Sequence, residues 1–291
     1  MRGAAAFLAL FLMGCGGGGS KQGYQLDAEL ASAIPADTVA LGGGRWDLIQ
    51  QSPLFARLRP MLPTLPQFGF DPSKDVKEFA AAYNGRDPLL LISGTFRTQD
   101  VLNKLAAEPG AQRSDYHGKP VVSRGEAGVA ALSAKVLAAG PLPRLREAVD
   151  RVAAGAKLDE RWAAGLRTLP AGAQLFLLTS GGATLNLPRG SNLGNLDKIL
   201  GSVDSLSAWA DFSKSVHLAA TASARDANAA KQLHTQLRGM IGLGRLSTPD
   251  DKPELLKFYD AIQTKLDDRK IDVDVDMPES VLDTLLKQVR P

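Results

Sequence analysis

Short apolar runs with the period of a strand alternate with stretches of helical period along most of the chain. Asn84-Gly85 stands between two of the apolar runs, a pattern typical of a hairpin turn. The run at 89–92 is apolar at every position, which predicts a central strand buried on both faces. The expected elements of the first half are a strand at 39–41 that ends in Gly42-Gly43-Gly44, a helix at 48–62 capped by Asp47 and reset at Pro53, strands at 79–83 and 89–96, a helix from Thr98, a tight turn at 116–119, a strand at 129–139 and a helix from Pro143.

The second half repeats this order of elements with few identical residues. Its expected elements are a strand at 174–179, a helix at 196–206, strands at 208–212 and 216–223, a helix from Asp226, and a strand at 271–277 followed by a helix. Strand, helix, strand, strand, helix, strand is the order of a ferredoxin-like unit. The sequence therefore predicts an α+β fold, a tandem duplication of a ferredoxin-like unit with mainly antiparallel sheets and helices packed on one face.

The two predicted units set the domain boundaries. Residues 31–156 form the first repeat and residues 169–291 the second. Residues 157–168 have no strand signal, and we expect them to be the connector between the repeats. The second repeat also carries an insertion at 242–266. The insertion is expected to hold an extra helix with an apolar face made of Leu255, Phe258, Tyr259, Ile262 and Leu266.

The start of the chain has a different pattern. Arg2 precedes an unbroken apolar run at 4–13, and Gly14 comes directly before Cys15, the only cysteine. A helix of ten residues measures about 15 Å, half of a hydrocarbon core of about 30 Å, so this run is too short to span a bilayer. A positive start, a short apolar run and small residues at its end are typical of a secretory signal. Leu12-Met13-Gly14-Cys15 resembles the lipobox of bacterial lipoproteins.

This resemblance implies where the chain is held. In bacterial lipoproteins the lipobox cysteine is acylated and the peptide before it is removed, so residues 1–15 would be a signal peptide that ends in the lipid-carrying Cys15. Residues 16–30 begin with four glycines and are expected to be a flexible tether. Gly16 stands where, by the family's sorting rule, an aspartate would favour the inner membrane. The expected location is therefore the bacterial cell envelope, in the outer membrane and facing the periplasm.

Composition narrows the classes of partner. The chain is 44% hydrophobic and 22% charged, as in globular proteins with a sizeable core. Its 34 Lys and Arg against 31 Asp and Glu leave a formal net charge of +3. The basic residues are scattered, so no nucleic-acid partner is expected. Once Cys15 is acylated, no thiol is left for a disulfide, and stability has to come from core burial.

Three aspartates near the C-terminus are the only metal candidates. Asp272, Asp274 and Asp276 alternate with apolar residues, so a strand would place their carboxylates on one face, about 6.6 to 6.8 Å apart. Calcium takes roughly six to eight oxygens, usually from a loop that curves around the ion. A straight strand does not curve, and the glycine and glutamate of the calcium loop are missing. We therefore prefer a solvated strand face, or an edge protected by charge, to a metal site.

Other candidate chemistry is sparse. His117, His217 and His234 are expected in a turn, a strand and a helix, and no two histidines have ligand spacing, so we expect no zinc site and no cofactor. The nucleophile patterns Gly-x-Ser-x-Gly and Ser-x-x-Lys are absent from the sequence. Ser180 follows a strand, but no helix opens behind it, so we expect it in a loop. No catalytic residue is assigned.

Two further features have a structural and a functional interpretation. Trp46 and Trp209 are expected to pack in the core or against a sheet rather than to form ligand platforms. The segment 181–195 is a long irregular connection inside a compact unit, and such loops are either functional or only mobile. The sequence does not choose between these two interpretations of the segment.

The anchor and the lack of a catalytic constellation favour a non-enzymatic module that binds or scaffolds an envelope protein partner. The alternative is a hydrolase or other enzyme whose site is assembled from distant segments, with His117, His217 or the three aspartates as members. A sensor or inhibitor domain is a third interpretation. Pro35-Ala36-Asp37-Thr38 before a strand, together with the duplicated layout, resembles uncharacterised envelope lipoproteins, a likeness that transfers no functional residue.

Overall fold

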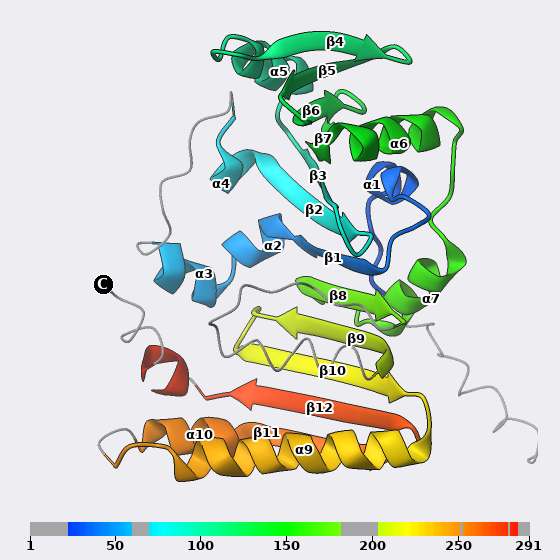
Figure 1. The fold of residues 1–291 in the computed structure, drawn as a ribbon. Helices are drawn as coiled ribbons and strands as arrows, with labels where there is room; N and C mark the ends of the chain where they lie inside the picture. The colour runs from blue at the N-terminus through cyan, green and yellow to red at the C-terminus, as the bar shows by residue number, and fades with distance from the viewer. Residues whose placement is uncertain (1–22, 60–69, 182–202, 251–252, 279, 285–291) are drawn as a thin grey trace, which may run out of the picture.

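The computed structural model of the protein describes residues 23–59, 70–181, 203–250, 253–278 and 280–284. Within these residues twelve strands form one sheet, in the order β11-β12-β10-β9-β8-β1-β2-β3-β7-β6-β5-β4 (Figure 1). All neighbouring strands in it are antiparallel. The predicted α+β class with antiparallel strands is therefore confirmed.

Strands and helices follow each other along the described chain with short connections. The strands are β1 (Ala40–Arg45), β2 (Val76–Tyr83), β3 (Pro88–Gly94), β4 (Gln112–Tyr116), β5 (Lys119–Arg124), β6 (Ala127–Ala131), β7 (Val136–Pro141), β8 (Leu175–Ser180), β9 (Val203–Asp211), β10 (Val216–Ala224), β11 (Ile262–Asp267) and β12 (Lys270–Met277). The labelled helices are α1 (Ala28–Ala33), α2 (Trp46–Gln50), α3 (Pro53–Leu58), α4 (Pro72–Asp75), α5 (Thr98–Ala106), α6 (Leu142–Ala153), α7 (Glu160–Thr168), α9 (Ala227–Leu246) and α10 (Glu254–Ala261). Residues 280–284, after β12, are helical as well.

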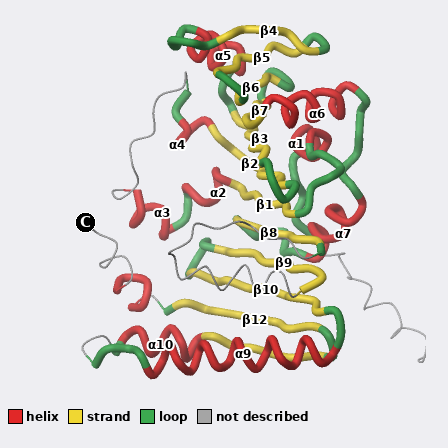
Figure 2. The backbone as a smooth tube through the Cα atoms, in the orientation of Figure 1, coloured by secondary structure: helices red, strands yellow, loops and turns green. Residues whose placement is uncertain are grey.

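The strand order is the same in both halves when it is followed outward from the centre. β1 and β8 pair at the centre, with Ala40 opposite Thr179 and Gly44 opposite Leu175. From this pair the order is β1-β2-β3-β7 in one direction and β8-β9-β10-β12 in the other. In each half a helix follows the third of these strands, α5 in the first half and α9 in the second. Two similar patterns thus continue into a single sheet, which Figure 2 shows as one ladder of strands.

Strand pairing inside each half differs from that of the predicted ferredoxin-like unit. A split strand-helix-strand motif places another strand between the two strands that its helix connects. Here β1 pairs directly with β2, from Ala40 opposite Tyr83 to Arg45 opposite Glu78. The helices between these strands are short, so the chain returns beside the strand it has left instead of crossing over the sheet. The centre of the sheet is therefore a meander.

The largest core cluster contains residues from both halves. Leu41 of β1 and Leu178 of β8 lie opposite each other in the central pair and belong to this cluster. Residues 157–168, the expected connector, include helix α7, and its Trp162 and Leu166 are buried in the same cluster. Their spacing of four residues is a helical signal. The connector is thus a packed part of the core.

Helices cover both faces of the sheet, whereas the sequence predicted one face. One face, which we call the α6 face, is covered by α1, α6 and α7. The side chains of Leu41 and Leu178 point to it. Leu175 points to the opposite side, where it clusters with Ile49 of α2 and Phe55 of α3. The register places the residues that pack on α5 and α9 on this second side as well, and we call it the α9 face. A sheet twelve strands wide has enough apolar surface to need helices on both sides.

The predicted helix at 48–62 is interrupted just before Pro53, where the sequence predicted that the helix restarts. α2 begins at Trp46, with Arg45 rather than Asp47 at its N-cap position. α3 then starts at Pro53, and the Ser52 hydroxyl accepts a hydrogen bond from the Phe55 amide. Proline at the first position of a helix suits this start because it has no N–H to leave unsatisfied. The predicted positions beyond 59 lie outside the described residues.

Two other predicted elements differ from the structure. The expected strand at 129–139 is a hairpin of β6 and β7, because residues 132–135 turn the chain back on itself. The expected extra helix of the insertion ends at Ala261, and its apolar positions Ile262 and Leu266 belong to β11. Apolar residues four apart also fall on one face of a strand, which is why the pattern was ambiguous.

Candidate functional site

A cavity of about 620 Å³ lies on the α9 face in the middle of the sheet. Its floor spans strands β2, β1, β8, β9, β10 and β12. Apolar side chains and glycines line this central cavity: Gly42, Gly43, Phe79, Ala81, Leu175, Phe176, Leu177, Ala208, Trp209, Ala210, Leu218, Ala219, Ala220, Val273 and Val275.

Strand pairing explains why the sheet is hollow here. Small residues occupy most of one row of directly opposite positions, which reads Ala81, Gly42, Leu177, Ala208, Ala220 and Val273 across six strands. Larger side chains, including Leu175, Leu218 and Val275, stand in the next row. Alternate Gly and Ala positions in the strand segments are the sequence signal of this cavity. Among its lining residues only Trp209 was considered from the sequence as a ligand platform, and packing was preferred for it.

The lining of the central cavity restricts its chemistry. Among the described residues, none of the side chains that line the cavity is ionisable, so these residues offer no general acid, general base or metal ligand. Such a lining can bind a ligand only by removing apolar surface from water, and this burial contributes roughly 25 cal/mol per Å² to the binding free energy. The geometry therefore suits the binding of an apolar group.

The three predicted metal candidates lie on the α6 face of the second half. Asp272, Asp274 and Asp276 are alternate residues of β12, as the expected strand requires. The Thr221 hydroxyl of β10 donates to the Asp272 carboxylate at 2.7 Å. His217 Nε2 lies 2.9 Å from the Asp274 carboxylate, and its Nδ1 lies 3.6 Å from that of Asp276. Asp272 is thus paired with Thr221, and Asp274 and Asp276 share His217, across the strand pair.

His217 is placed as part of this polar strand face. Its two ring nitrogens both face carboxylates, Nε2 at hydrogen-bonding distance from Asp274 and Nδ1 at 3.6 Å from Asp276. The ring lies 4.8 Å from that of Trp209, which packs at the edge of the main core cluster. Among the described residues no three His, Cys, Asp or Glu side chains gather closely enough to hold a metal ion.

The other predicted positions are dispersed over the fold. His117 lies in the turn after β4, where Nδ1 is 3.0 Å from the Asp150 carboxylate. His234 of α9 has Nε2 3.1 Å from the Thr264 hydroxyl of β11. Ser180, expected in a loop, is instead the last residue of β8 and pairs with Ser205. Trp46 donates its indole N–H to the carbonyl of residue 72 at 2.9 Å, and this bond fixes its ring in place.

A buried polar cluster holds residues 23–27, the first described residues of the chain, against the sheet. The Tyr24 side chain is buried on the α6 face, and its hydroxyl donates to the Glu78 carboxylate at 2.8 Å. The other Glu78 oxygen accepts the Asp27 amide at 2.8 Å. The Arg45 guanidinium lies 4.9 Å from the centre of the Tyr24 ring. Burial raises the pKa of both the Tyr24 hydroxyl and the Glu78 carboxyl. These contacts hold residues 23–27 against the middle of the sheet, and α1 begins at Ala28. The described part of the expected flexible tether at 16–30 is therefore packed against the fold, and that part of the prediction is wrong.

The buried Glu78 carboxyl is expected to make stability depend on pH. Burial raises its pKa above the ordinary 4.5, so the native state holds this proton more tightly than the unfolded state. This contribution to the free energy of unfolding is full below pH 4.5 and is lost as the pH rises through the folded-state pKa. Urea denaturation between pH 4 and 8 should show that Glu78→Gln removes the decline. The exposed control Glu126→Gln should keep it, and equal slopes for Glu78→Gln and the wild type would contradict the prediction.

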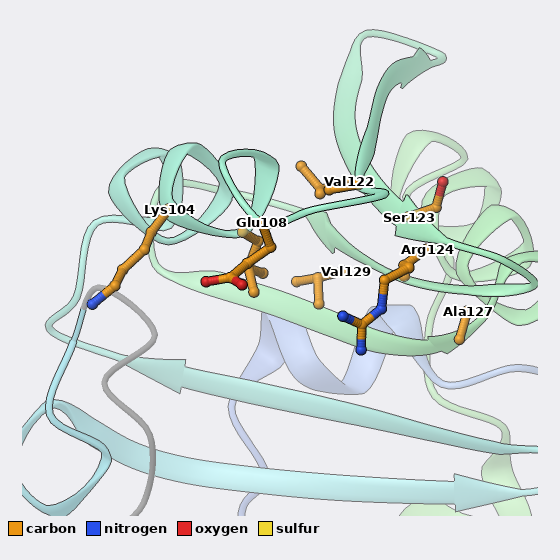
Figure 3. Close-up of a pocket in the computed structure, with 10 residues that line it drawn as sticks. Lys104, Glu108, Val122, Ser123, Arg124, Ala127 and Val129 are labelled. Atoms are coloured by element: carbon orange, nitrogen blue, oxygen red, sulfur yellow. The ribbon is translucent and has the colours of Figure 1, made fainter.

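A second cavity, of about 500 Å³, lies between α5 and the strands β5 and β6. Figure 3 shows the Glu108 carboxylate and the Arg124 guanidinium at its rim and Lys104 on α5, with Val122 and Val129 between the elements. The rim is charged and the interior apolar. None of the residues singled out in the sequence lies in this cavity.

Several predicted features lie outside the described residues. They are the signal peptide, Cys15, the tether up to residue 22 and nearly all of the segment 181–195. None of the helices in the described ranges combines the length and the apolar character needed to cross a bilayer.

Comparisons with known proteins bear on the fold. No family model matches the chain, and no curated protein matches it. Among solved structures it is similar to crystal form I of TP0453, with a TM-score of 0.53, 9% identity, and coverage of 91% of this chain and 98% of that one. Crystal form III gives a TM-score of 0.53 at 9% identity, covering 90% and 99% of the two chains. At this identity the likeness shows the fold alone: the α+β arrangement of the chain resembles that of TP0453 along nearly its whole length.

Proposed function

We propose that the chain is a lipid-anchored lipoprotein of the bacterial envelope, held through Cys15 in the outer membrane and facing the periplasm. In this role it works without catalysis and binds another envelope protein through the central cavity. The signal-like start, the lipobox and the glycine-rich tether support the anchor. The partner's side of the contact would be an apolar segment, because only apolar groups gain from this lining.

The central cavity is the observation that carries the binding role. Apolar side chains line about 620 Å³ on a sheet face between α2 and α3 on one side and α9 on the other. Large exposed apolar patches on soluble domains are typical of sites where proteins or ligands bind. A helix or strand of a partner that covered this cavity would remove the patch from water.

The enzyme alternative has less support. Tyr24 and Glu78, two groups whose pKa values are raised by burial, are occupied by each other and by the Asp27 amide on the α6 face, opposite the cavity. His217 faces Asp274 and Asp276 and has no nucleophile among its hydrogen-bond partners. A binding role needs none of these groups.

A pair of neighbouring alanines on β10 tests the proposal. Both residues line the cavity, but only Ala220 directs its side chain into it. The Ala219 side chain points to the α6 face beside Asp274, so Ala219 contributes only backbone to the cavity. Ala220→Lys places a charge in the apolar surface and is expected to lower partner capture by about tenfold or more. Ala219→Lys places the same charge beside the acidic strand and should leave capture unchanged.

The measurement uses the full chain in its native membrane. A photoreactive residue at position 79, at the rim of the cavity, crosslinks whatever lies over it, and thermal unfolding confirms that both lysine variants are folded. One recurrent crosslinked protein that Ala220→Lys loses and Ala219→Lys retains is the expected result. Equal capture by both variants, or turnover of a small substrate by the purified chain, would overturn the proposed function.

A further inference from the structure

β4 forms one end of the sheet and presents an open edge. It pairs with β5 on one side, and no described strand pairs with it on the other. Residues 112–115 are all exposed, and Tyr116 is half-buried. An end strand of this kind exposes backbone N–H and C=O groups that another strand can pair with.

The β4–β5 hairpin determines which residues direct their backbone groups outward. His117 and Gly118, with φ angles of 49° and 73°, make a two-residue turn closed by Tyr116 and Lys119. Such a closing pair is hydrogen-bonded, and hydrogen-bonded pairs alternate along the hairpin. Asp115 is therefore in a non-bonded pair, which agrees with Pro120 opposite it, since proline has no N–H. The backbone groups of Asp115, and of Arg113 two residues before it, point away from β5.

We infer that β4 pairs with β4 of a second copy of this chain, antiparallel and with Ser114 on the two-fold axis. In this register Arg113 of each copy is opposite Asp115 of the other. Both residues direct their backbone groups outward, so each of the two pairs exchanges two hydrogen bonds. Residues centred on Ser114 thus make a strand that complements itself, as a symmetric dimer requires.

Charge makes the second copy the preferred occupant of this edge. Edges that are protected against pairing carry charges that repel a copy of themselves. Arg113 and Asp115 flank the centre with opposite signs, so the antiparallel arrangement forms two attractive cross-strand pairs. In the single chain Arg113 donates to Asn103 at 2.9 Å, and Asp115 accepts the Gly118 amide at 2.8 Å. The first bond uses one guanidinium nitrogen of Arg113 and the second uses one carboxylate oxygen of Asp115. The remaining nitrogens and the second oxygen can bind a partner chain.

The symmetry also agrees with the proposed lipid anchor, on which this one step rests. A two-fold axis perpendicular to the sheet keeps the α6 faces of both copies on the same side. Residues 23–27 lie on that face, so both tethers would approach the same bilayer. Five residues of edge make a small interface, and confinement of both copies to one membrane raises their effective concentration.

Cysteine crosslinking of the full chain in its native membrane tests the register. Opposite residues of a non-bonded pair have Cα atoms about 4.5 Å apart, within the range that a disulfide bridges. Ser114→Cys should therefore form a disulfide dimer under mild oxidation. Gln112→Cys is the matched control, because the two copies of position 112 would lie about 14 Å apart. The wild-type chain controls for Cys15.

Charge substitutions then test the pairing itself. Arg113→Glu added to Ser114→Cys turns both attractive pairs into repulsive ones and should lower the crosslinked fraction roughly fivefold or more. Asp115→Lys added to Ser114→Cys should do the same. When the two variants are co-expressed, positions 113 and 115 carry opposite charges only where one chain of each variant pairs with the other. The crosslink should therefore return in the heterodimer. Equal crosslinking at 112 and 114, or no loss with Arg113→Glu, would overturn the inference.

Discussion

Replacement of Trp162 by alanine is expected to lower the free energy of unfolding by about 3–5 kcal/mol. The Trp162 side chain is 2% exposed and lies in the largest core cluster. That cluster includes Leu41 from β1 and Leu178 from β8, so the loss of the indole leaves a void where the two halves meet. The effect should therefore reach the whole sheet.

Two control substitutions separate the loss of core packing from the loss of the indole N–H and from the general effect of a substitution to alanine. The buried indole N–H of Trp162 has no acceptor within the described structure, so Trp162→Phe removes an unsatisfied donor while keeping an aromatic ring. It should cost clearly less than Trp162→Ala. Leu246→Ala, at a side chain that is 85% exposed, should change stability by no more than about 0.5 kcal/mol.

Chemical denaturation followed by tryptophan fluorescence and by circular dichroism measures this effect. Because the halves share a sheet and a core, a single transition seen by both probes is expected for the wild type and for Trp162→Phe. Two separate transitions, with Trp162→Ala shifting only one of them, would show that the halves unfold independently and would contradict the shared core.

Local features of the fold were predictable because their signals lie within a few residues. Asn84-Gly85 and His117-Gly118 make the expected turns, and three of these four residues have the positive φ angles that tight hairpins need. Asp226 caps α9 as expected, with its carboxylate accepting the Ala229 amide. Short-range chemistry decides such elements, so they can be read from the chain alone.

Strand neighbours were not predictable by the same means. The central pair joins Leu41 to Leu178, residues far apart in the chain, and no local pattern specifies that contact. The prediction of separate sheets followed from the repeat of elements, which says nothing about which edges meet. The helix α7 was missed although Trp162 and Leu166 have helical spacing, because the residues that this pair packs against come from other segments.

The candidate site shows the same division. Alternation alone placed Asp272, Asp274 and Asp276 on one strand face, and the structure agrees. The central cavity depends on small residues that are opposite each other only after six strands have been arranged in order. Gly42 and Ala220 therefore appeared as unremarkable strand positions in the sequence.

The glycine run of β1 leads to a sharp contrast between two neighbouring residues. The sequence predicted that the strand ends at Gly42, yet β1 continues through the three glycines to Arg45. A Cβ on Gly43 would lie 2.7 Å from the Phe176 ring and 2.7 Å from the Phe79 carbonyl oxygen. A Cβ on Gly42 would lie 3.5 Å from the nearest atom, an ordinary contact.

Gly43→Ala is therefore expected to cost about 1–3 kcal/mol of unfolding free energy, because a backbone oxygen of the neighbouring strand cannot move aside without breaking the β1–β2 pairing. Gly42→Ala should be neutral or should stabilise by roughly 0.5–1 kcal/mol, since alanine restricts the unfolded chain more than glycine does. Urea denaturation of both variants measures the difference. Equal effects would mean that Phe176 does not press on β1, and the close contact between the two halves at the centre of the sheet would then be wrong.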